Sequence, residues 1–300
     1  MKRSKFYYLT HPSVGIPALL AKVSDRYAIE QMWKKRMSYP LNLDNPQTFS
    51  EKLQWLKLYN RQPYYTKLVD KYLVKDIVGN KIGQEYIIPT LGVYKHFDDI
   101  NFESLPNQFV LKCNHDSGSI VVCLDKQKFN ITEAKSFLEK CLANNYYIAS
   151  REWPYKNVER RIIAEPYMKD DNNPLLTDYK FYCFNGEPKV LYVSYGLADH
   201  DTAFISYMTL DWKPAPFHRP DFQEYTEFPP RPQSFDKMIE IAKTLSTDMP
   251  FVRVDFYEIN KKPYFSEMTF FPGDGLTPFE PVEYDVKFGE WVKLPTHSNR

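Results

Sequence analysis

The sequence has 300 residues, and its 39 Lys and Arg residues nearly balance its 38 Asp and Glu residues, giving a formal net charge of +1. A chain of this length can bury one large core or two small ones. The neutral balance excludes a global field that would attract nucleic acid or an acidic surface. We therefore expect no nucleic-acid partner, and any anion site must be local.

Glycine is scarce in this chain, with 10 residues, whereas aromatic residues make up 16%. Neither of the two glycine-rich phosphate-binding signatures, GxGxxG and GxxxxGK[ST], occurs in the sequence. The composition therefore argues against a Rossmann domain and against a P-loop nucleotide-binding domain.

The cysteines and the N-terminus indicate the compartment. The four cysteines form no CxxC pair and lie in apolar or aromatic segments, which predicts buried free thiols in a reducing environment; they are Cys113, Cys123, Cys141 and Cys183. The N-terminal apolar stretch is interrupted by prolines and lacks a small-residue cleavage site, which argues against a signal peptide. No run reaches about 18 apolar residues, so we expect a soluble, cytoplasmic protein, and peripheral association with the inner membrane face stays open.

The first 60 residues have a helical period and are predicted to form a helical N-terminal region. Within it, Thr48 followed by Glu51 fits a capping box at the start of a helix. A further helix is predicted in YYTKLVDKYLVKDIVGNKIG, ending near Gly79 to Gly83. The short β-branched run IIPTLGVY then reads as a strand.

The remaining sequence contains several strands. The segment QFVLKCNHDSGSIVVCLD predicts two strands joined by a polar loop, followed by a helix capped at Asn130, and RRIIAEPYM predicts another strand. Asn185-Gly186 lies between two alternating aromatic runs, which is a strong hairpin signal. FDKMIEIAKTLS reads as an amphipathic helix, and the last 25 or so residues give no clear element. This order predicts an α+β fold with antiparallel sheets.

The stretch FVRVDFYEINKKPYFSEMTFFPG predicts a hairpin that carries charges on one face. If the turn centres on Lys261, Asp255 faces Glu267 and Arg253 faces Thr269, since strand side chains alternate with period two. Two groups of apolar residues should then surround the charges. Phe251, Tyr257, Phe265 and Phe271 would share the charged face, and Val252, Val254, Phe256, Tyr264, Met268 and Phe270 would form the core face.

Two like charges opposite each other on a sheet are destabilising unless something compensates. Arg253 could compensate alone on a solvated charged face. The alternative is Mg²⁺, which prefers one or two carboxylates together with phosphate oxygens. Because aromatic residues are expected beside Asp255 and Glu267, the sequence favours the metal.

Two more segments could contact a nucleotide. Lys112 alternates out of an apolar strand before a small polar loop, where it could hold a phosphate while the backbone N–H groups of Ser117, Gly118 and Ser119 wrap that group. An exposed strand lysine is the alternative, and His115 in this loop reads as structural or solvated. The second segment is IIAEPYM, which could present Glu165 to an adenine edge, with Tyr167 and Met168 on the ring faces; the alternative is an ordinary strand end. In the following strand Asp178 and Lys180 point the same way and could reach ribose or phosphate.

Taken in order, these pieces resemble the ATP-grasp superfamily, and more closely its TupA-like branch, found with teichuronopeptide and surface-polysaccharide genes. The resemblance covers about residues 65 to 280 and is carried by DKYLVKDIV, IIPTLGVY, FVLKCNHDSG, RRIIAEPYM, DYKFYCFNG and RVDFYEINKKPYFSEMTFFPG. It implies an ATP-grasp fold in which two α+β subdomains clasp ATP. We accordingly predict a helical region over 1–60, a first subdomain over 61–162 and a second over 163–300.

The resemblance also implies roles for individual residues. Lys112 and Lys180, with Lys71 as a weaker candidate, would bind ATP phosphates, and Glu165, Tyr167, Met168 and Asp178 would surround the adenine and ribose. Asp255 and Glu267 would ligate Mg²⁺, while Arg253 steadies the transferring phosphoryl group. Thr269 replaces the usual Asn ligand, which puts a second metal ion in doubt, and the loop HDSGS has less glycine than is typical.

The function that this resemblance implies is an ATP-dependent carboxylate–amine ligase that works through an acyl phosphate. Its substrates would be an amine or amino acid and a uronic acid of a capsular, O-antigen or cell-wall polysaccharide, or of a sugar nucleotide. The alternatives are a glycosyltransferase that uses a nucleotide sugar and a non-catalytic glycan-binding protein. A nucleotide-sugar site would need acidic residues, for which Asp170-Asp171 is the candidate. This pair is interpreted as an ordinary acidic turn.

Overall fold

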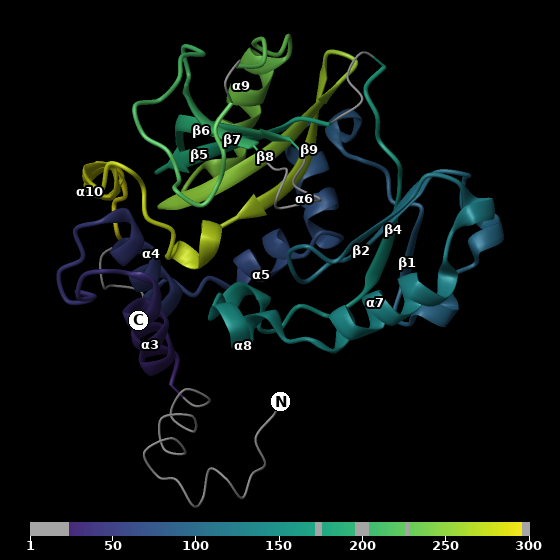
Figure 1. Ribbon diagram of the computed structural model, residues 1–300, viewed down its shortest axis with the longest axis horizontal. Coiled ribbons are helices and arrows are strands. Elements are labelled where there is room, and N and C mark those ends of the chain that lie inside the picture. Colours follow the sequence, from purple (N-terminus) through teal and green to yellow (C-terminus); the bar gives the residue numbers. More distant parts are fainter. Residues whose placement is uncertain (1–23, 172–175, 196–203, 226–227, 296–300) are drawn as a thin grey trace, which may run out of the picture.

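The computed structural model describes residues 24–171, 176–195, 204–225 and 228–295, in which two antiparallel sheets are surrounded by helices (Figure 1). The helices are α3 (Asp25–Arg36), α4 (Phe49–Tyr59), α5 (Pro63–Val69), α6 (Leu73–Ile82), α7 (Ile131–Ala143), α8 (Tyr146–Ser150), α9 (Phe235–Ser246) and α10 (Glu283–Trp291). The strands are β1 (Gly92–Tyr94), β2 (Phe109–Cys113), β3 (Ile120–Cys123), β4 (Ile162–Pro166), β5 (Asp178–Phe184), β6 (Glu187–Tyr195), β7 (Phe204–Thr209), β8 (Phe251–Ile259) and β9 (Lys262–Thr269). The predicted α+β class with antiparallel sheets is confirmed.

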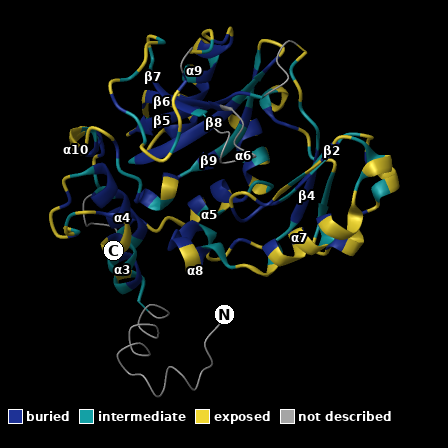
Figure 2. Ribbon diagram, in the orientation of Figure 1, coloured by how far each residue is buried: buried dark blue, intermediate teal, exposed yellow. Residues whose placement is uncertain are grey.

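The larger sheet has the strand order β7-β6-β5-β8-β9, and helix α9 covers one of its faces. Because side chains alternate along β5, Phe181 lies on the face covered by α9. Its ring centroid is 5.6 Å from that of Phe235. The strands of this sheet are largely buried, as Figure 2 shows. The opposite face carries the preceding residue, Lys180, and two residues further along that face Tyr182 packs on Phe251, so the charged side chains lie beside apolar core residues.

The smaller sheet has the order β1-β4-β2-β3, with α7 packed on one face. Leu111 of β2 and Leu138 of α7 belong to the same buried cluster, which is separate from the core of the larger sheet. Lys112, between Leu111 and Cys113, alternates to the other face. The polar residues proposed for nucleotide binding are therefore turned away from α7.

Local signals of the sequence are reproduced closely. The capping box of Thr48 and Glu51 opens α4, and Asn130 caps α7 by accepting from the Glu133 N–H. Helix α6 ends at Gly83, whose φ is 109°. In the β5–β6 turn Asn185 and Gly186 both have positive φ, 49° and 84°, as a type I′ turn requires.

Two elements had no sequence signal strong enough to predict them. Strand β7 forms the edge of the larger sheet, and α10 lies in the C-terminal part where we expected no element. Asp285 holds α10 against the start of α4 by accepting from both the N–H and the hydroxyl of Ser50, each at 3.0 Å. Phe288 of α10 packs edge-on against Phe49, with ring centroids 5.9 Å apart.

The predicted boundary between the two subdomains, at residues 162 and 163, falls inside strand β4. This strand pairs with β1 and β2 in the smaller sheet. We therefore propose that the first subdomain continues to the end of β4 and that the second begins after it.

The four cysteines are free and buried, as expected. None of the helices in the described ranges is long and apolar enough to cross a membrane.

Candidate active site

The β8–β9 hairpin has the predicted pairs: Asp255 lies opposite Glu267 and Arg253 lies opposite Thr269. The turn, however, is not centred on Lys261. It contains Asn260 and Lys261, which both have positive φ, 50° and 67°, as in a type I′ turn.

A turn at this position would by itself shift the pairs by one residue. Near the turn Phe256 pairs with Phe265, and an irregularity between Asp255 and Phe256 then restores the predicted register. Ser266 is the additional residue on β9, so the hairpin contains a β-bulge. The predicted pairs are correct only because this bulge compensates for the different turn.

The bulge also changes which side chains flank the charges. Phe265, expected on the charged face, is 3% exposed, pairs with Phe256 and joins the main core. Tyr264, expected in the core, is only partly buried. The prediction for these two residues was wrong, because strict alternation from Glu267 back to the turn assumed a regular strand.

Arg253 lies between the two opposed acids. Its Nε and Nη2 donate to Oδ1 and Oδ2 of Asp255 at 2.7 and 2.6 Å, and Nη2 also contacts Glu267 Oε1 at 3.1 Å and Thr269 Oγ1 at 3.0 Å. Lys180 of β5, opposite Asp255 in the sheet, donates to Asp255 Oδ2 at 2.7 Å and lies 3.0 Å from Asp178 Oδ1. The compensation that we had assigned to a metal is thus supplied in this structure by Arg253 and Lys180.

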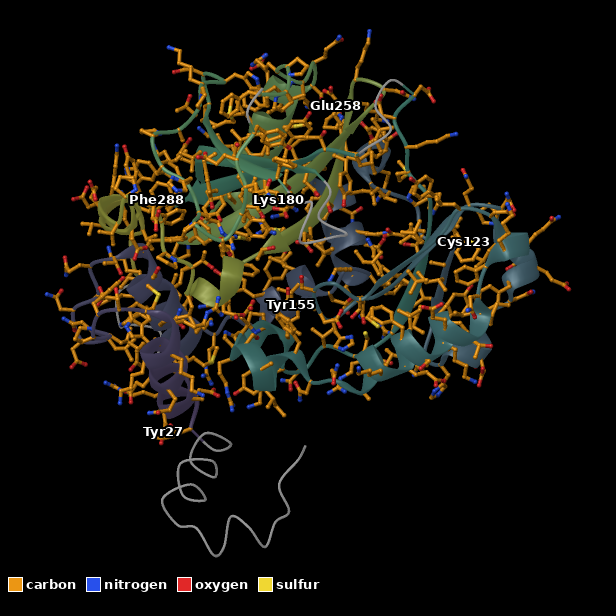
Figure 3. The ribbon with its side chains drawn as sticks, viewed as in Figure 1. Tyr27, Cys123, Tyr155, Lys180, Glu258 and Phe288 are labelled. Atoms are coloured by element: carbon orange, nitrogen blue, oxygen red, sulfur yellow. The ribbon has the colours of Figure 1, made fainter. Side chains whose placement is uncertain are left out.

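The electrostatics of Glu267 connect both sheets. Burial alone would raise the pKa of its carboxyl, but Lys71, Lys180, Arg253 and Lys112 outweigh this and lower the pKa to about 2. Lys112 belongs to the smaller sheet and Lys180 and Arg253 to the larger one, so cations from both sheets act on one carboxylate. Figure 3 shows Lys180 near the middle of the larger sheet.

Lys112 and Glu165 lie side by side on the smaller sheet and contact each other. Lys112 Nζ is 2.7 Å from Glu165 Oε2, and Lys75 of α6 is 2.5 Å from Glu165 Oε1. Glu165 is 4% exposed. Burial would raise the pKa of its carboxyl, and the two lysines more than offset this and lower it. Glu165 therefore acts in this structure as the counter-ion of two lysines.

Lys75 was missed by the sequence analysis, which chose Lys71 from the same segment. Lys75 also donates to Ile88 O at 2.8 Å and Thr90 Oγ1 at 2.9 Å, so its ammonium group is fixed. No local pattern marks this residue, because its ionic partner, Glu165, lies 90 residues further along the chain. Lys71 donates instead to the backbone carbonyl of Asp116, at the base of the predicted phosphate loop.

The predicted phosphate loop, residues 114–119, is buried at its base and exposed at its tip. Ser117 and Gly118 are exposed, whereas Ser119 is 4% exposed and donates to Asp116. Gly118 has a φ of 86°, and no atom lies within 4 Å of the position that a Cβ would occupy. Tyr167 and Met168 are partly buried in the segment after β4.

A second group of buried charges adjoins the hairpin, and it too was missed. Lys57 of α4 is fully buried and donates to the carbonyl groups of Ser150 at 2.9 Å and Asp274 at 2.7 Å. Burial, opposed mainly by Glu152, lowers the pKa of Lys57 to about 8, and burial raises the pKa of Glu152 to about 8. Residues 273–275, which present the Asp274 carbonyl to Lys57, all have positive φ.

The oxygen atoms of Asp255, Glu267 and Thr269 can ligate Mg²⁺ if Arg253 releases Asp255. Carboxylates and a hydroxyl are the hard oxygen ligands that this ion prefers, and the Glu267 side chain is 32% exposed. Asp255 is fully buried, and both its oxygens accept from Arg253. An anionic phosphate would compete for the guanidinium group and free a carboxylate oxygen, so the residues fit a metal that arrives together with a phosphate.

Comparison with known proteins gives one family. The model of the family described as TupA-like ATPgrasp matches residues 51–293, more than three quarters of the chain. A search of curated proteins gives no match.

Three of the solved structures to which this chain is similar are as follows. D-Alanine–D-alanine ligase from Helicobacter pylori is 15% identical with a TM-score of 0.42, and the match covers 82% of this chain and 69% of that chain. The enzyme of the same name from Bacillus anthracis, complexed with ATP, is 15% identical with a TM-score of 0.37, covering 68% and 53%. The ATP-grasp ligase PsnB, complexed with a phosphomimetic variant of its minimal precursor, Mg and ADP, is 9% identical with a TM-score of 0.41, covering 80% and 67%. This chain thus spans about half of the Bacillus anthracis ligase.

Proposed function

The chain belongs to the TupA-like ATP-grasp family, and we propose that it is an ATP-dependent carboxylate–amine ligase. In this proposal it joins an amine or amino acid to the carboxylate of a uronic acid, within a capsular, O-antigen or cell-wall polysaccharide or its sugar nucleotide. The observation that supports it best is the convergence of Lys71, Lys112, Lys180 and Arg253 on Glu267.

Four cations around one carboxylate can hold a triphosphate. Lys112 and Lys180 would act as point charges on the phosphate oxygens, and Arg253 would bind the transferring phosphoryl group with its planar guanidinium. Lys75 joins this set, because it shares Glu165 with Lys112. The exposed amides of Ser117 and Gly118 would close over the same phosphates.

All of these cations except Lys71, which donates to the backbone carbonyl of Asp116, are neutralised by a carboxylate in the structure. Lys75 and Lys112 are paired with Glu165, and Lys180 and Arg253 with Asp255. Binding of ATP would exchange these partners for phosphate oxygens. Glu165 would then be free to turn towards the adenine edge, beside Tyr167 and Met168, with Asp178 near the ribose.

Mg²⁺ would be held by Asp255 and Glu267, with Thr269 as a further oxygen ligand. When bound, this ion would neutralise charge on the phosphate oxygens and position the phosphoryl group. Arg253 would release Asp255 and move to the phosphate, which places a positive charge where negative charge develops.

The reaction requires two balanced steps. A carboxylate oxygen of the uronic acid attacks the γ-phosphorus, the bond between that phosphorus and the bridging oxygen breaks, and ADP leaves with its electron pair. The amine nitrogen then attacks the acyl carbon, inorganic phosphate leaves and the amine releases its proton. Lys112, Lys180 and Arg253 would stabilise the charge in the first step without forming covalent bonds.

Two arguments limit the alternative of a glycosyltransferase. The family is an ATP-grasp family, and Asp170 and Asp171 bind the hairpin turn, since they accept from the N–H and the side-chain amide of Asn260 at 2.6 and 3.0 Å. We assign the protein to the cytoplasm, at the inner membrane face where such glycans are built, as part of the same proposal.

The proposal is tested with the full chain, ATP, Mg²⁺, a panel of uronic acids and a panel of amines. We expect ADP release only when a carboxylate is present, and a hydroxamate when hydroxylamine replaces the amine. Turnover of a nucleotide sugar without ATP consumption would support the glycosyltransferase instead. Binding of glycan without turnover of either nucleotide would support a non-catalytic protein.

A further inference from the structure

Three potential metal ligands meet at the end of β2, on the side of the smaller sheet that packs against α7. They are Cys113, His115 and Asp116, and one ligand atom from each lies within 4.8 Å of those of the other two. The residues are 1%, 2% and 8% exposed. Cys113 follows Lys112 on the strand and points to the opposite face, so its thiol is turned away from Lys112, while Asp116 directly precedes the tip of the predicted phosphate loop.

Two atoms of this cluster are buried without a hydrogen-bond partner among the described residues, namely His115 Nδ1 and Asp116 Oδ1. An unpartnered buried polar atom costs about 1–3 kcal/mol, and most such atoms in native proteins are satisfied. Two such atoms in adjacent residues, within a cluster that also contains the Cys113 thiol, indicate a ligand site.

The other polar atoms of the same side chains are already held. His115 Nε2 lies 3.4 Å from the carbonyl oxygen of Asn144, and Asp116 Oδ2 accepts from the hydroxyl of Ser119. In metal sites a ligating histidine commonly donates its second N–H to a backbone carbonyl, and a ligating carboxylate is itself hydrogen-bonded. The hydrogen bonds that orient metal ligands are therefore present. The two remaining atoms, His115 Nδ1 and Asp116 Oδ1, are the ones that would bind the ion.

We propose that Cys113, His115 and Asp116 bind a divalent transition-metal ion, and that Zn²⁺ fits this donor set best. Sulfur, imidazole nitrogen and carboxylate oxygen together suit Zn²⁺ and do not suit Mg²⁺, which takes oxygen ligands. Tetrahedral Zn²⁺ with these ligands has donor atoms roughly 3.3–3.8 Å apart, so a separation of at most 4.8 Å needs only a small contraction. A water molecule would occupy the fourth position.

Binding is chemically balanced without a further reactant. Cys113 ligates the ion as a thiolate, so its thiol proton is released to the buffer, while Nδ1 of a neutral His115 and the Asp116 carboxylate supply their lone pairs. Because Asp116 also receives the Lys71 ammonium on its backbone carbonyl, the ion would fix the base of the loop 114–119. It would do so without touching Lys112.

Cobalt provides the direct test, since Co²⁺ takes the place of Zn²⁺ and reports thiolate ligation by a charge-transfer band in the near ultraviolet. The full chain is freed of metal with a chelator and titrated with Co²⁺ in excess Mg²⁺, which competes with Co²⁺ for sites made of oxygen ligands alone. We expect the band to saturate at one Co²⁺ per chain and to disappear when Zn²⁺ is added. A folded wild-type chain that gives no band would overturn the proposal.

Three variants assign the band. C113S should abolish it, whereas C123S should retain it; Cys123 is the matched control because it is equally buried, at 1%, in the same core cluster. D116N provides a second test in case C113S misfolds, because the substitution keeps the side-chain volume. We expect D116N to weaken Co²⁺ binding at least about tenfold with an unchanged circular dichroism spectrum. A band that persists in C113S, or full affinity in D116N, would contradict the proposal.

A fourth variant separates this site from the hairpin. E267Q should keep the band and the stoichiometry, because Glu267 is not part of the cluster. Loss of the band in E267Q alone would show that Co²⁺ binding requires the hairpin, and it would contradict a site made of Cys113, His115 and Asp116.

Discussion

Lys180 Nζ lies 2.7 Å from Asp255 Oδ2, in a part of the larger sheet where Asp255 is fully buried. Arg253, two residues before Asp255 on the same face of β8, reaches the same oxygen at 2.6 Å. Two cations thus share one carboxylate, and both are close enough to a common point to receive a phosphate together.

Removal of Lys180 should destabilise the protein strongly. In K180M the buried carboxylates of Asp255 and Asp178 lose the ammonium group that neutralises them. Removing one partner of a buried ion pair lowers the free energy of unfolding by about 3–5 kcal/mol. Urea unfolding measures this loss. The double variant K180M/D255N should recover part of it, because the uncompensated carboxylate is removed as well; a double variant as unstable as the sum of both single variants would show that the pair is not coupled.

Lys75 should contribute to nucleotide binding as much as Lys112 does, because both ammonium groups contact Glu165. We expect K75M and K112M each to weaken ATP binding at least about tenfold, a loss of about 1.4 kcal/mol. Calorimetric titration with the nucleotide and Mg²⁺ measures this. K128M is the control, since Lys128 is 86% exposed, and equal affinities of K75M and K128M would contradict a role for Lys75.

Glu267 should make stability depend on pH in acid. Its pKa is lowered from 4.5 to about 2 in the folded chain, because the surrounding lysines and Arg253 outweigh burial. A lowered pKa stabilises the folded state above pH 4.5, and this contribution is lost as pH falls from 4.5 through 2. The contribution is at most about 3 kcal/mol, and solvent reduces it because the side chain is 32% exposed.

The measurement compares the wild type with E267Q, which keeps the side-chain shape and cannot titrate. The difference in free energy of unfolding between the two proteins should be constant from pH 7 to 5 and should shrink below pH 4.5. A difference that stays constant down to pH 2.5 would show that the four cations do not act on this carboxylate.

The hairpin turn should gain stability from glycine at Lys261. A non-glycine residue with positive φ is strained by roughly 1–2 kcal/mol, and Lys261 has a φ of 67° after Asn260 at 50°. K261G gives this turn the Asn-Gly sequence that the β5–β6 turn already has. We expect its free energy of unfolding to rise by about 0.5–1 kcal/mol, and a decrease would argue against the two-residue turn.

Sequence reasoning succeeded where the signal is local. The capping box at Thr48, the Asn185-Gly186 turn and the helix end at Gly83 each depend on residues within a few positions of one another. The pairing of Asp255 with Glu267 was also predicted, but it is correct only because the bulge at Ser266 offsets a turn one residue away from the predicted form.

It failed where the deciding contact is distant or irregular. Lys75 and Glu165 are 90 residues apart, and Lys57 meets Asp274 across an even longer separation, so no local pattern marks either lysine. The bulge at Ser266 moved Phe265 into the core, because an additional residue in a strand reverses the alternation. Helix α10 is held by Asp285 against Ser50, a contact that only the folded chain makes.

Carboxylate-dependent release of ADP from ATP in D255N and E267Q tests the central claim most directly. The proposed ligase needs both acids to hold Mg²⁺ on the triphosphate, so each variant should lose at least about 100-fold in rate, some 2.7 kcal/mol of transition-state stabilisation. Circular dichroism and thermal melting of both variants check that the fold is retained. Two folded variants that release ADP at the wild-type rate would contradict the account.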